Sequence, residues 1–210
     1  MIVVVSGPSG VGKGALVEGV SELAPAIHVG VSCTTRSPRP GERDGVDYHF
    51  LSQEDFRNRV ANDEFAEWQE VYEGKLYGTL KEELKHEVVL LEIECRGARV
   101  IKQRYPQTQA VFILPPTYLE LERRLREREQ GSKEGEVLER LAKAAQEIHQ
   151  VSLFDFWIEN LEIKDSIQRL WGMMQILHRK GKPSHQFFRC PTLLGRVQST
   201  FPSNTASFAV

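Results

Sequence analysis

The first fourteen residues constrain the fold most, because a strongly apolar run there leads directly into a glycine-rich loop. Residues 2–5 read Ile-Val-Val-Val, and four β-branched residues in a row predict a strand buried on both faces. Residues 6–14 read Ser-Gly-Pro-Ser-Gly-Val-Gly-Lys-Gly, and apolar residues at helical spacing follow from Leu16. A strand, a glycine loop and a helix in this order can gather backbone N–H groups around an anion at the start of the helix. The segment therefore predicts a phosphate-binding loop.

The loop departs from the usual phosphate-binding pattern at one position. Gly7, Gly12 and Lys13 fit the pattern of a glycine, four residues, a glycine and a lysine. The next residue is usually Ser or Thr, whose hydroxyl binds magnesium, but this chain has Gly14 there and Ala15 after it. The alternative interpretation is a glycine-rich turn beneath a helix, without a ligand.

The composition is that of an ordinary globular chain of 210 residues, of which 27% are charged and 40% hydrophobic. No window approaches the roughly 20 apolar residues of a membrane-spanning helix, so we expect no membrane association and no signal peptide. Cys33, Cys95 and Cys190 lack the spacing of a metal site, and isolated thiols are typical of the reducing cytoplasm. Residues 166–210 carry six basic and no acidic groups, but these are too scattered to predict nucleic-acid binding.

Three further apolar runs predict buried strands at residues 88–94, 110–114 and 153–158. Amphipathic segments separate them, and strands that alternate with helices predict a mainly parallel α/β sheet. The first of these runs ends in Glu92 and Glu94, which share one face of the strand. Carboxylates in that position can hold or orient magnesium in phosphate-binding folds.

Helices are expected between and after the strands. Ser52, Thr79 and Thr117 are each followed three residues later by an acidic residue, a pattern that predicts a capped helix N-terminus. The last amphipathic pattern covers residues 163–177. Residues 181–210 lose this periodicity and gain Pro, Ser and Thr, so we expect a flexible or loosely packed tail.

Two parts of the chain carry arginines suited to phosphate binding. Arg36 and Arg39 lie three residues apart in a loop rich in Thr and Pro, where two guanidinium groups can converge on one phosphate. Residues 120–129 alternate arginines with glutamates. Such a helix is also typical of a solvated surface with ion pairs four residues apart, such as Glu120 with Arg124.

Nine features follow one another along the chain: Ser-Gly-Pro-Ser-Gly-Val-Gly-Lys at 6–13, Thr-Thr-Arg-x-Pro-Arg at 34–39, Gly-x-Asp-Tyr-x-Phe at 45–50, Glu-Phe-x-Glu at 64–67, Tyr-Gly-Thr at 77–79, Glu-Ile-Glu at 92–94, Pro-Pro at 115–116, Arg-Leu-x-x-Arg at 124–128, and Asn160. This order is typical of guanylate kinases, and over roughly residues 1–178 the chain resembles that family.

The resemblance implies an α/β phosphate-loop kinase core with a mainly parallel sheet flanked by helices. That core would consist of residues 1–30, 81–117 and 146–180. A GMP-binding insert would span residues 31–80 and a helical lid residues 118–145, with the tail at 181–210.

The family transfers the terminal phosphoryl group of ATP to GMP, with Mg²⁺ accompanying ATP. The acceptor is a phosphate oxygen that is already anionic near neutral pH, so no deprotonating base is needed. Catalysis then consists of aligning two polyanions and neutralising charge on the transferred group. No side chain is expected to bind Mg²⁺ directly, because nucleotide oxygens and water can hold it.

The resemblance also implies a set of site residues. ATP binding is assigned to Gly7, Pro8, Ser9, Gly10, Val11, Gly12, Lys13 and Gly14. GMP binding is assigned to Ser32, Arg36, Arg39, Tyr48, Glu67, Tyr77, Thr79 and Glu94, and catalysis to Lys13, Arg124, Arg128 and Arg140. Glu67 would select guanine, because its ionised carboxylate can accept from the adjacent N1–H and amino groups of that base.

The chain departs from the family pattern in the lid as well as in the loop. Glu127 and Glu129 flank Arg128 where the family commonly has glycine, and they could pair with that arginine. The alternative function is a guanylate-kinase-like protein-interaction module with weak or no catalysis. Such modules typically lose the loop lysine, which this chain keeps as Lys13. The sequence does not indicate an oligomeric state.

Overall fold

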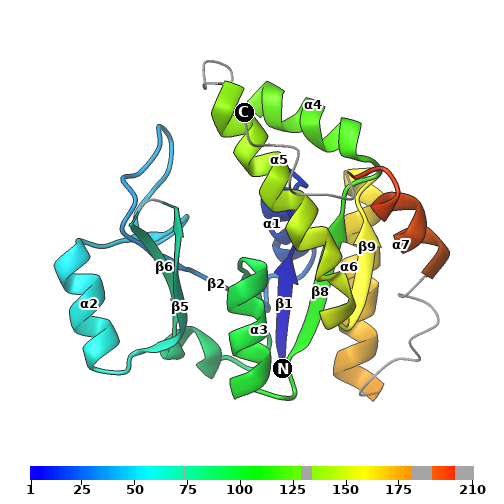
Figure 1. Ribbon diagram of the computed structural model, residues 1–210. Coiled ribbons are helices and arrows are strands. Elements are labelled where there is room, and N and C mark those ends of the chain that lie inside the picture. Colours follow the sequence, from blue (N-terminus) through cyan, green and yellow to red (C-terminus); the bar gives the residue numbers. More distant parts are fainter. Residues whose placement is uncertain (73, 129–133, 181–190, 202–210) are drawn as a thin grey trace.

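Two β-sheets organise the chain, and its computed structural model describes residues 1–72, 74–128, 134–180 and 191–201 (Figure 1). The larger sheet has the strand order β2-β7-β1-β8-β9, and all its neighbouring strands are parallel. This confirms the predicted mainly parallel α/β sheet. Its strands are β1 (Ile2–Ser6), β2 (His28–Gly30), β7 (Val89–Glu92), β8 (Gln109–Leu114) and β9 (Phe156–Glu159).

The predicted strand β1 is central, between β7 and β8, and its Val3, Val4 and Val5 are fully buried. Helices on both faces exclude water from it, which is why its sequence is continuously apolar. Because the strands are parallel, their carboxyl ends meet at one edge of the sheet, where ligands bind in open α/β folds. One face is covered by α3 (Cys95–Arg104) and α5 (Glu134–His149), the other by α1 (Lys13–Leu23) and α6 (Ile163–Lys180) (Figure 1).

The smaller sheet lies within residues 33–80 and has the order β4-β3-β6-β5. Helix α2 (Gln53–Ala61) packs on this sheet through Phe56, whose ring stacks on that of Phe65 with centroids 4.4 Å apart. Arg104 of α3 donates to the carbonyl oxygen of Ala66 (2.8 Å), so α3 connects the two sheets. The strands are β3 (Cys33–Thr34), β4 (His49–Phe50), β5 (Phe65–Tyr72) and β6 (Lys75–Leu80), and the last two form an antiparallel hairpin.

Two of the three predicted helix caps are confirmed. The hydroxyl groups of Ser52 and Thr117 each accept a backbone hydrogen bond, at the starts of α2 and of α4 (Tyr118–Arg128). The cap predicted at Thr79 is wrong. The chain forms a short 3-10 helix there (Lys81–Lys85), which begins without a side-chain cap.

The expectation of a loosely packed tail is wrong for the part of it that the structure describes. Residues Pro191–Gln198 form helix α7, and the side chains of Val197 and Phe201 are buried in the main core. Apolar residues at helical spacing from Leu193 to Val197 carry this signal, which the Pro, Ser and Thr content obscured. Residues 181–190 and 202–210 lie outside the described part of the chain.

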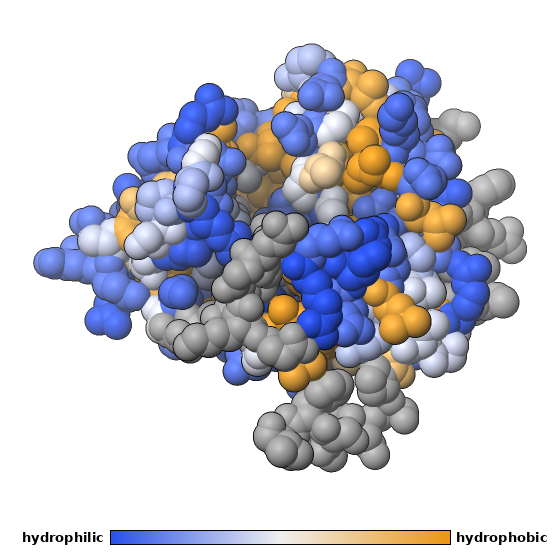
Figure 2. Space-filling model, turned by 90° about the horizontal axis from the view of Figure 1, so that it is seen from above, coloured by the Kyte–Doolittle hydropathy of each residue, from blue (hydrophilic) through white to orange (hydrophobic). Residues whose placement is uncertain are grey.

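The surface seen from above is largely hydrophilic, and hydrophobic side chains appear on it as separate patches (Figure 2). Leu119 and Leu161 are among the large apolar residues that remain exposed. Isolated exposed leucines are common on globular proteins and carry no further meaning here. Across the described residues, no helix is both long and apolar enough to cross a membrane.

We expect Phe56→Ala to destabilise the smaller sheet selectively. Phe56 is fully buried in a cluster whose other buried members are Cys33, Phe65 and Leu76, so few neighbours can fill the cavity. A loss of about 3–5 kcal/mol is typical of such a truncation. Hydrogen exchange should become faster for the amides of β5 and β6 while those of β1 and β8 stay protected. Equal loss of protection in both sheets would contradict this expectation.

Candidate functional site

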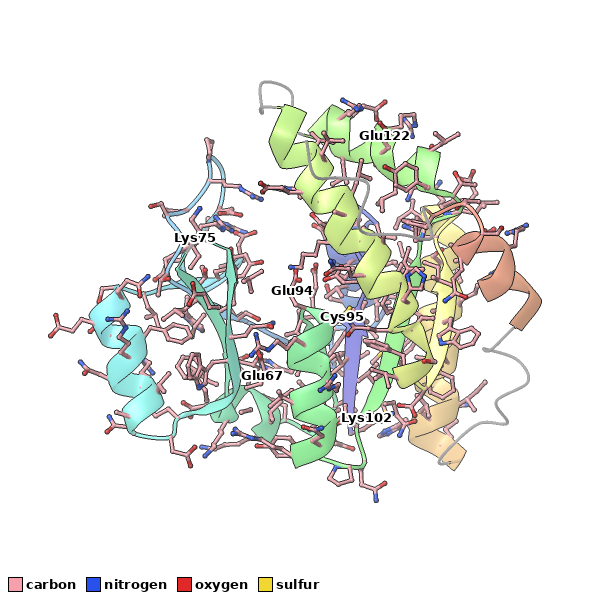
Figure 3. All side chains as sticks on the ribbon, viewed as in Figure 1. Glu67, Lys75, Glu94, Cys95, Lys102 and Glu122 are labelled. Carbon is pink, nitrogen blue, oxygen red and sulfur yellow. The ribbon has the colours of Figure 1, made fainter. Side chains whose placement is uncertain are left out.

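A cleft of about 630 Å³ lies between the two sheets, at the carboxyl edge of the larger one. Glu67 on β5 and Glu94 at the start of α3 both lie at the space between the sheets (Figure 3). Most of the residues singled out from the sequence line this cleft: Ser9, Gly10, Gly12, Lys13, Gly14, Ser32, Arg36, Arg39, Tyr48, Glu67, Tyr77, Glu94 and Arg140.

The loop after β1 has the geometry of an anion site. Gly12 directly precedes α1 with φ 95°, a left-handed conformation that favours glycine. A Cβ atom there would lie 2.6 Å from the Asn160 side-chain nitrogen, which itself donates to the Val11 carbonyl oxygen (2.8 Å). A side chain at this position would therefore break the contact that holds the loop.

Lys13 extends back over the same loop. Its ammonium group donates to the carbonyl oxygens of Gly7 (2.7 Å) and Pro8 (3.1 Å), and the residue is 9% exposed. Neutral acceptors hold the group in place without cancelling its charge. The positive end of the α1 dipole and this ammonium group thus face the same end of the cleft.

Arg36 and Arg39 are in the same loop of the insert, and a carboxylate sits between them. The Arg36 guanidinium donates to both oxygens of Glu42 (2.7 and 2.9 Å), and the Arg39 backbone N–H donates to Glu42 as well (2.7 Å). The bond to Arg36 lowers the pKa of Glu42, so the carboxylate is ionised at neutral pH. Glu42 thus occupies a position that is suited to an anion, and the sequence analysis missed it.

Tyr48 and Tyr77 stand beside this arginine. The Arg36 guanidinium lies 5.0 Å from the centre of the Tyr48 ring, and the two tyrosine rings meet edge to face at 6.1 Å. Burial raises the pKa of Tyr48 to about 12, so its hydroxyl keeps its proton and can donate a hydrogen bond.

Glu67 has one satisfied and one unsatisfied carboxylate oxygen. It pairs with Thr79 across the β5–β6 hairpin, and its Oε1 accepts from the Thr79 hydroxyl (2.9 Å). The Oε2 atom is buried and has no hydrogen-bond partner among the described residues. Burial raises the pKa of Glu67 to about 7, although the Thr79 bonds and the charge of Arg104 oppose this. A donor on a ligand would relieve this unsatisfied acceptor.

Gly97, which the sequence analysis did not single out, makes room for this carboxylate. It lies in the first turn of α3, where a Cβ atom would come within 2.6 Å of the Glu67 Oε2 atom. The absence of a side chain at Gly97 therefore allows Glu67 to lie where it does.

Glu94 is held by lysines at the junction of α3 and α5. Lys143 of α5 forms an ion pair with it (2.7 Å). Burial opposes ionisation of Glu94, but the charges of Lys13 and Lys143 outweigh burial and lower its pKa. Burial and the nearby Glu94 charge raise the pKa of Glu147 to about 8, so Glu147 is mainly protonated at neutral pH. The sequence analysis missed both Lys143 and Glu147.

The lid arginines differ in their contacts. Arg140 on α5 lines the cleft. Arg124 on α4 forms the predicted ion pair with Glu120 (2.7 Å), and it also donates to the carbonyl oxygen of Asn160 (3.2 Å) beside the phosphate loop. The side chain of Arg128 lies outside the described residues.

The remaining predicted residues lie behind the surface of the cleft. Gly7, Pro8 and Val11 contribute backbone to the loop wall, where two of their carbonyl oxygens hold Lys13. Thr79 is fully buried behind Glu67.

Comparison with known proteins agrees with this arrangement. The family model described as guanylate kinase matches residues 1–177. The guanylate kinase of Synechococcus sp. (strain JA-3-3Ab) is 42% identical over 178 residues, which cover 82% of this chain and 81% of that protein. That of Carboxydothermus hydrogenoformans is 39% identical over 194 residues, covering 90% and 93%.

A solved structure shows the same likeness. The crystal structure of guanylate kinase from Anaplasma phagocytophilum superimposes with a TM-score of 0.67 and 28% sequence identity. The match covers 87% of this chain and 96% of that one.

We expect Gly97→Ala to weaken binding of GMP, the ligand predicted from the sequence. The new methyl group must displace the Glu67 carboxylate, so KM for GMP should rise about tenfold, as for the loss of one hydrogen bond to a charged group. Gly172→Ala in α6 is the matched control, because a Cβ atom there meets nothing within 4 Å. Steady-state kinetics of both variants would test this, and equal KM values would contradict it.

Proposed function

This chain belongs to the guanylate kinase family, and we propose that its cleft transfers the terminal phosphoryl group of ATP to GMP, giving ADP and GDP. One observation supports this most directly. A phosphate loop with its lysine and a buried carboxylate with an unsatisfied oxygen face one cleft, with the Arg36 loop beside them. Such a cleft has separate recognition groups for two nucleotides.

The loop is the proposed ATP side. Its backbone N–H groups, from Gly7 to Gly14 except at Pro8, which has none, and the Lys13 ammonium would hold the ATP phosphates. Lys13 is already oriented by two neutral carbonyl oxygens, so little ordering is required when the phosphates arrive.

The insert is the proposed GMP-phosphate side. Arg36, Arg39, Tyr48 and Tyr77 would hold the GMP phosphate through charge-assisted hydrogen bonds. Glu42 would have to yield part of its hold on Arg36, because both anions need the same guanidinium donors. The internal ion pair therefore keeps Arg36 ordered until the phosphate arrives.

The guanine base would be read by Glu67. Its ionised carboxylate can accept from N1–H and from the exocyclic amino group, with Ser32, Thr79 and Glu94 assisting. Adenine lacks this pair of donors, so it would leave the buried carboxylate unsatisfied at a cost of roughly 1–3 kcal/mol.

Transfer itself would need alignment and charge neutralisation. The attacking GMP phosphate oxygen carries its own negative charge, so no residue has to remove a proton. Lys13, Arg124, Arg128 and Arg140 would stabilise the charge that spreads over the transferred group. These cationic groups come from separate elements, so closure of the insert and the lid would bring them together.

Mg²⁺ is proposed as the companion of ATP. Glu92 Oε2 lies 3.5 Å from the position of a Cβ atom on Gly14, so a carboxylate stands where the usual Ser or Thr hydroxyl is missing. Glu92 fits the water shell of a metal held mainly by nucleotide oxygens. When bound, the ion neutralises charge on the ATP phosphates.

No observation favours the alternative of a non-catalytic interaction module. The free thiols of Cys33 and Cys95 are in keeping with a cytoplasmic location, which we also propose.

The decisive assay measures ADP formed from ATP and Mg²⁺ with GMP, AMP, UMP or CMP as acceptor. We expect turnover with GMP only, and loss of at least about 100-fold in Lys13→Ala because an oriented positive charge is removed. Lys81→Ala, which removes an exposed lysine paired with Asp63, is the matched control. Absence of GMP-dependent turnover in the wild type would exclude the proposed function, and equal turnover of AMP would exclude the role of Glu67.

We expect kcat/KM for GMP to fall as the pH decreases through about 7, because Glu67 has a pKa of about 7 in the unliganded protein. Below that pH the carboxyl group gains a proton, and its O–H group then faces the N–H donors of guanine. The ionised carboxylate, which is the form that binds guanine, is therefore lost. The pH profile of Glu67→Gln is the control, since it retains the titration of the GMP phosphate but not that of residue 67. Identical profiles would rule out Glu67 as the titrating group.

A further inference from the structure

Residues 196–201, which are the end of α7 and the residues that follow it, reach the base of the lid, although the family match ends at residue 177. The Thr200 hydroxyl accepts a hydrogen bond from the backbone N–H of Tyr118 (3.0 Å), the first residue of lid helix α4. The first N–H groups of a helix lack partners within the helix, so an external acceptor stabilises its first turn. The tail thus supplies a cap that α4 does not provide for itself at this position.

An aromatic contact reinforces this hydrogen bond. The Phe201 ring stands perpendicular to the Tyr118 ring, at a centroid distance of 5.2 Å and an angle of 90°. Phe201 is 5% exposed and Val197 is fully buried, so both are anchored in the main core. Perpendicular aromatic pairs are favourable in energy and specific in geometry.

Two further contacts tie the same segment to the end of α5, where the chain returns from the lid to the core, and to the sheet. The Gln198 side-chain nitrogen donates to the carbonyl oxygen of Ile148, in the last turn of α5 (3.4 Å). Arg196 forms an ion pair with Glu159 at the end of β9 (2.5 Å). Figure 1 shows α7 beside β9 and near the N-terminal end of α4, where the chain enters the lid.

We propose that residues 196–201 form a clamp that fixes the base of the lid to the core and thereby positions Arg124 and Arg140 over the cleft. The clamp contacts Tyr118, where the chain enters the lid, and Ile148 in the last turn of α5, where the chain leaves it. It also contacts β9, whose next residue, Asn160, bonds to both Arg124 and the phosphate loop. Thr200 and Phe201 are positioning residues in this arrangement.

The clamp is compatible with lid closure because it acts at the hinge. A lid that rotates about its base moves least there, so contacts at Tyr118 and Ile148 can persist while the far ends of α4 and α5 approach the nucleotides. Loss of these contacts would instead allow Arg124 and Arg140 to occupy a wider range of positions over the cleft. A misplacement of about 1 Å can cost up to about 100-fold in rate.

The test compares Thr200→Val with Ser199→Ala and Thr200→Ser. The Ser199 hydroxyl donates to the Arg196 carbonyl oxygen within the clamp (2.7 Å), and Thr200→Ser retains the acceptor for Tyr118. In Thr200→Val we expect faster hydrogen exchange in the first turn of α4 and roughly a tenfold lower kcat, because the catalytic arginines are less well placed. KM for GMP should stay unchanged, since the insert and α7 lie on opposite sides of the molecule (Figure 1). Both control variants should behave as the wild type does.

The possible outcomes separate this inference from the proposed function on which it rests. Faster exchange in α4 together with lower kcat supports the clamp, whereas either change without the other overturns it. If the wild type shows no GMP-dependent turnover, the proposed function fails, and hydrogen exchange alone then decides whether the clamp holds the lid base.

A second variant, Phe201→Leu, keeps an apolar side chain and should give the same two changes to a smaller degree. Wild-type behaviour in both Thr200→Val and Phe201→Leu would overturn the inference.

Discussion

The parallel pairing of β1 with β7 and β8 is the constraint on which the rest of the structure depends. Val3 to Val5 are fully buried in this arrangement, and the chain leaves β1 at the same edge where it leaves β7 and β9. The phosphate loop, the start of α3 and Asn160 therefore meet at this edge, and the hydrogen bond from the Asn160 side chain to the Val11 carbonyl oxygen links two of them directly. Loop geometry then follows from the left-handed conformation of Gly12, whose lack of a side chain leaves room for the Asn160 side chain to bond to Val11.

Opposite charges hold the polar groups of the cleft in place. Arg36 bonds to Glu42, and Glu94 bonds to Lys143, so both of these groups already have an internal partner of opposite charge. Each internal pair offsets the desolvation that its members suffer in the cleft. Glu67 differs, because its Oε2 atom has no partner among the described residues and burial raises its pKa. The proposed recognition of guanine would thus use an acceptor that the described part of the chain leaves unsatisfied.

Local patterns predicted β1, β7, β8 and β9 and two helix caps, because strands buried on both faces are continuously apolar and a capping hydroxyl lies at a fixed spacing from an acidic residue. Residues whose partners are distant in the sequence could not be identified from such local patterns. Gly97 matters only because β5 places Glu67 against α3, and Lys143 matters only because α5 crosses the start of that helix. Helix α7 was missed for another reason, since its few apolar residues sit in a segment whose composition is typical of loops.

Because Glu67 is buried, the guanine-binding role that we propose for it would link nucleotide recognition to proton exchange with the solvent. With a pKa of about 7, the carboxyl group is protonated in about half of the unliganded molecules at that pH. Guanine requires the ionised form, so binding near neutrality would release about half a proton for each molecule of GMP taken up. The measured heat of binding would then contain a contribution from the buffer that receives this proton. A side chain that confers base specificity would in this way also make the apparent enthalpy of binding depend on the buffer chosen.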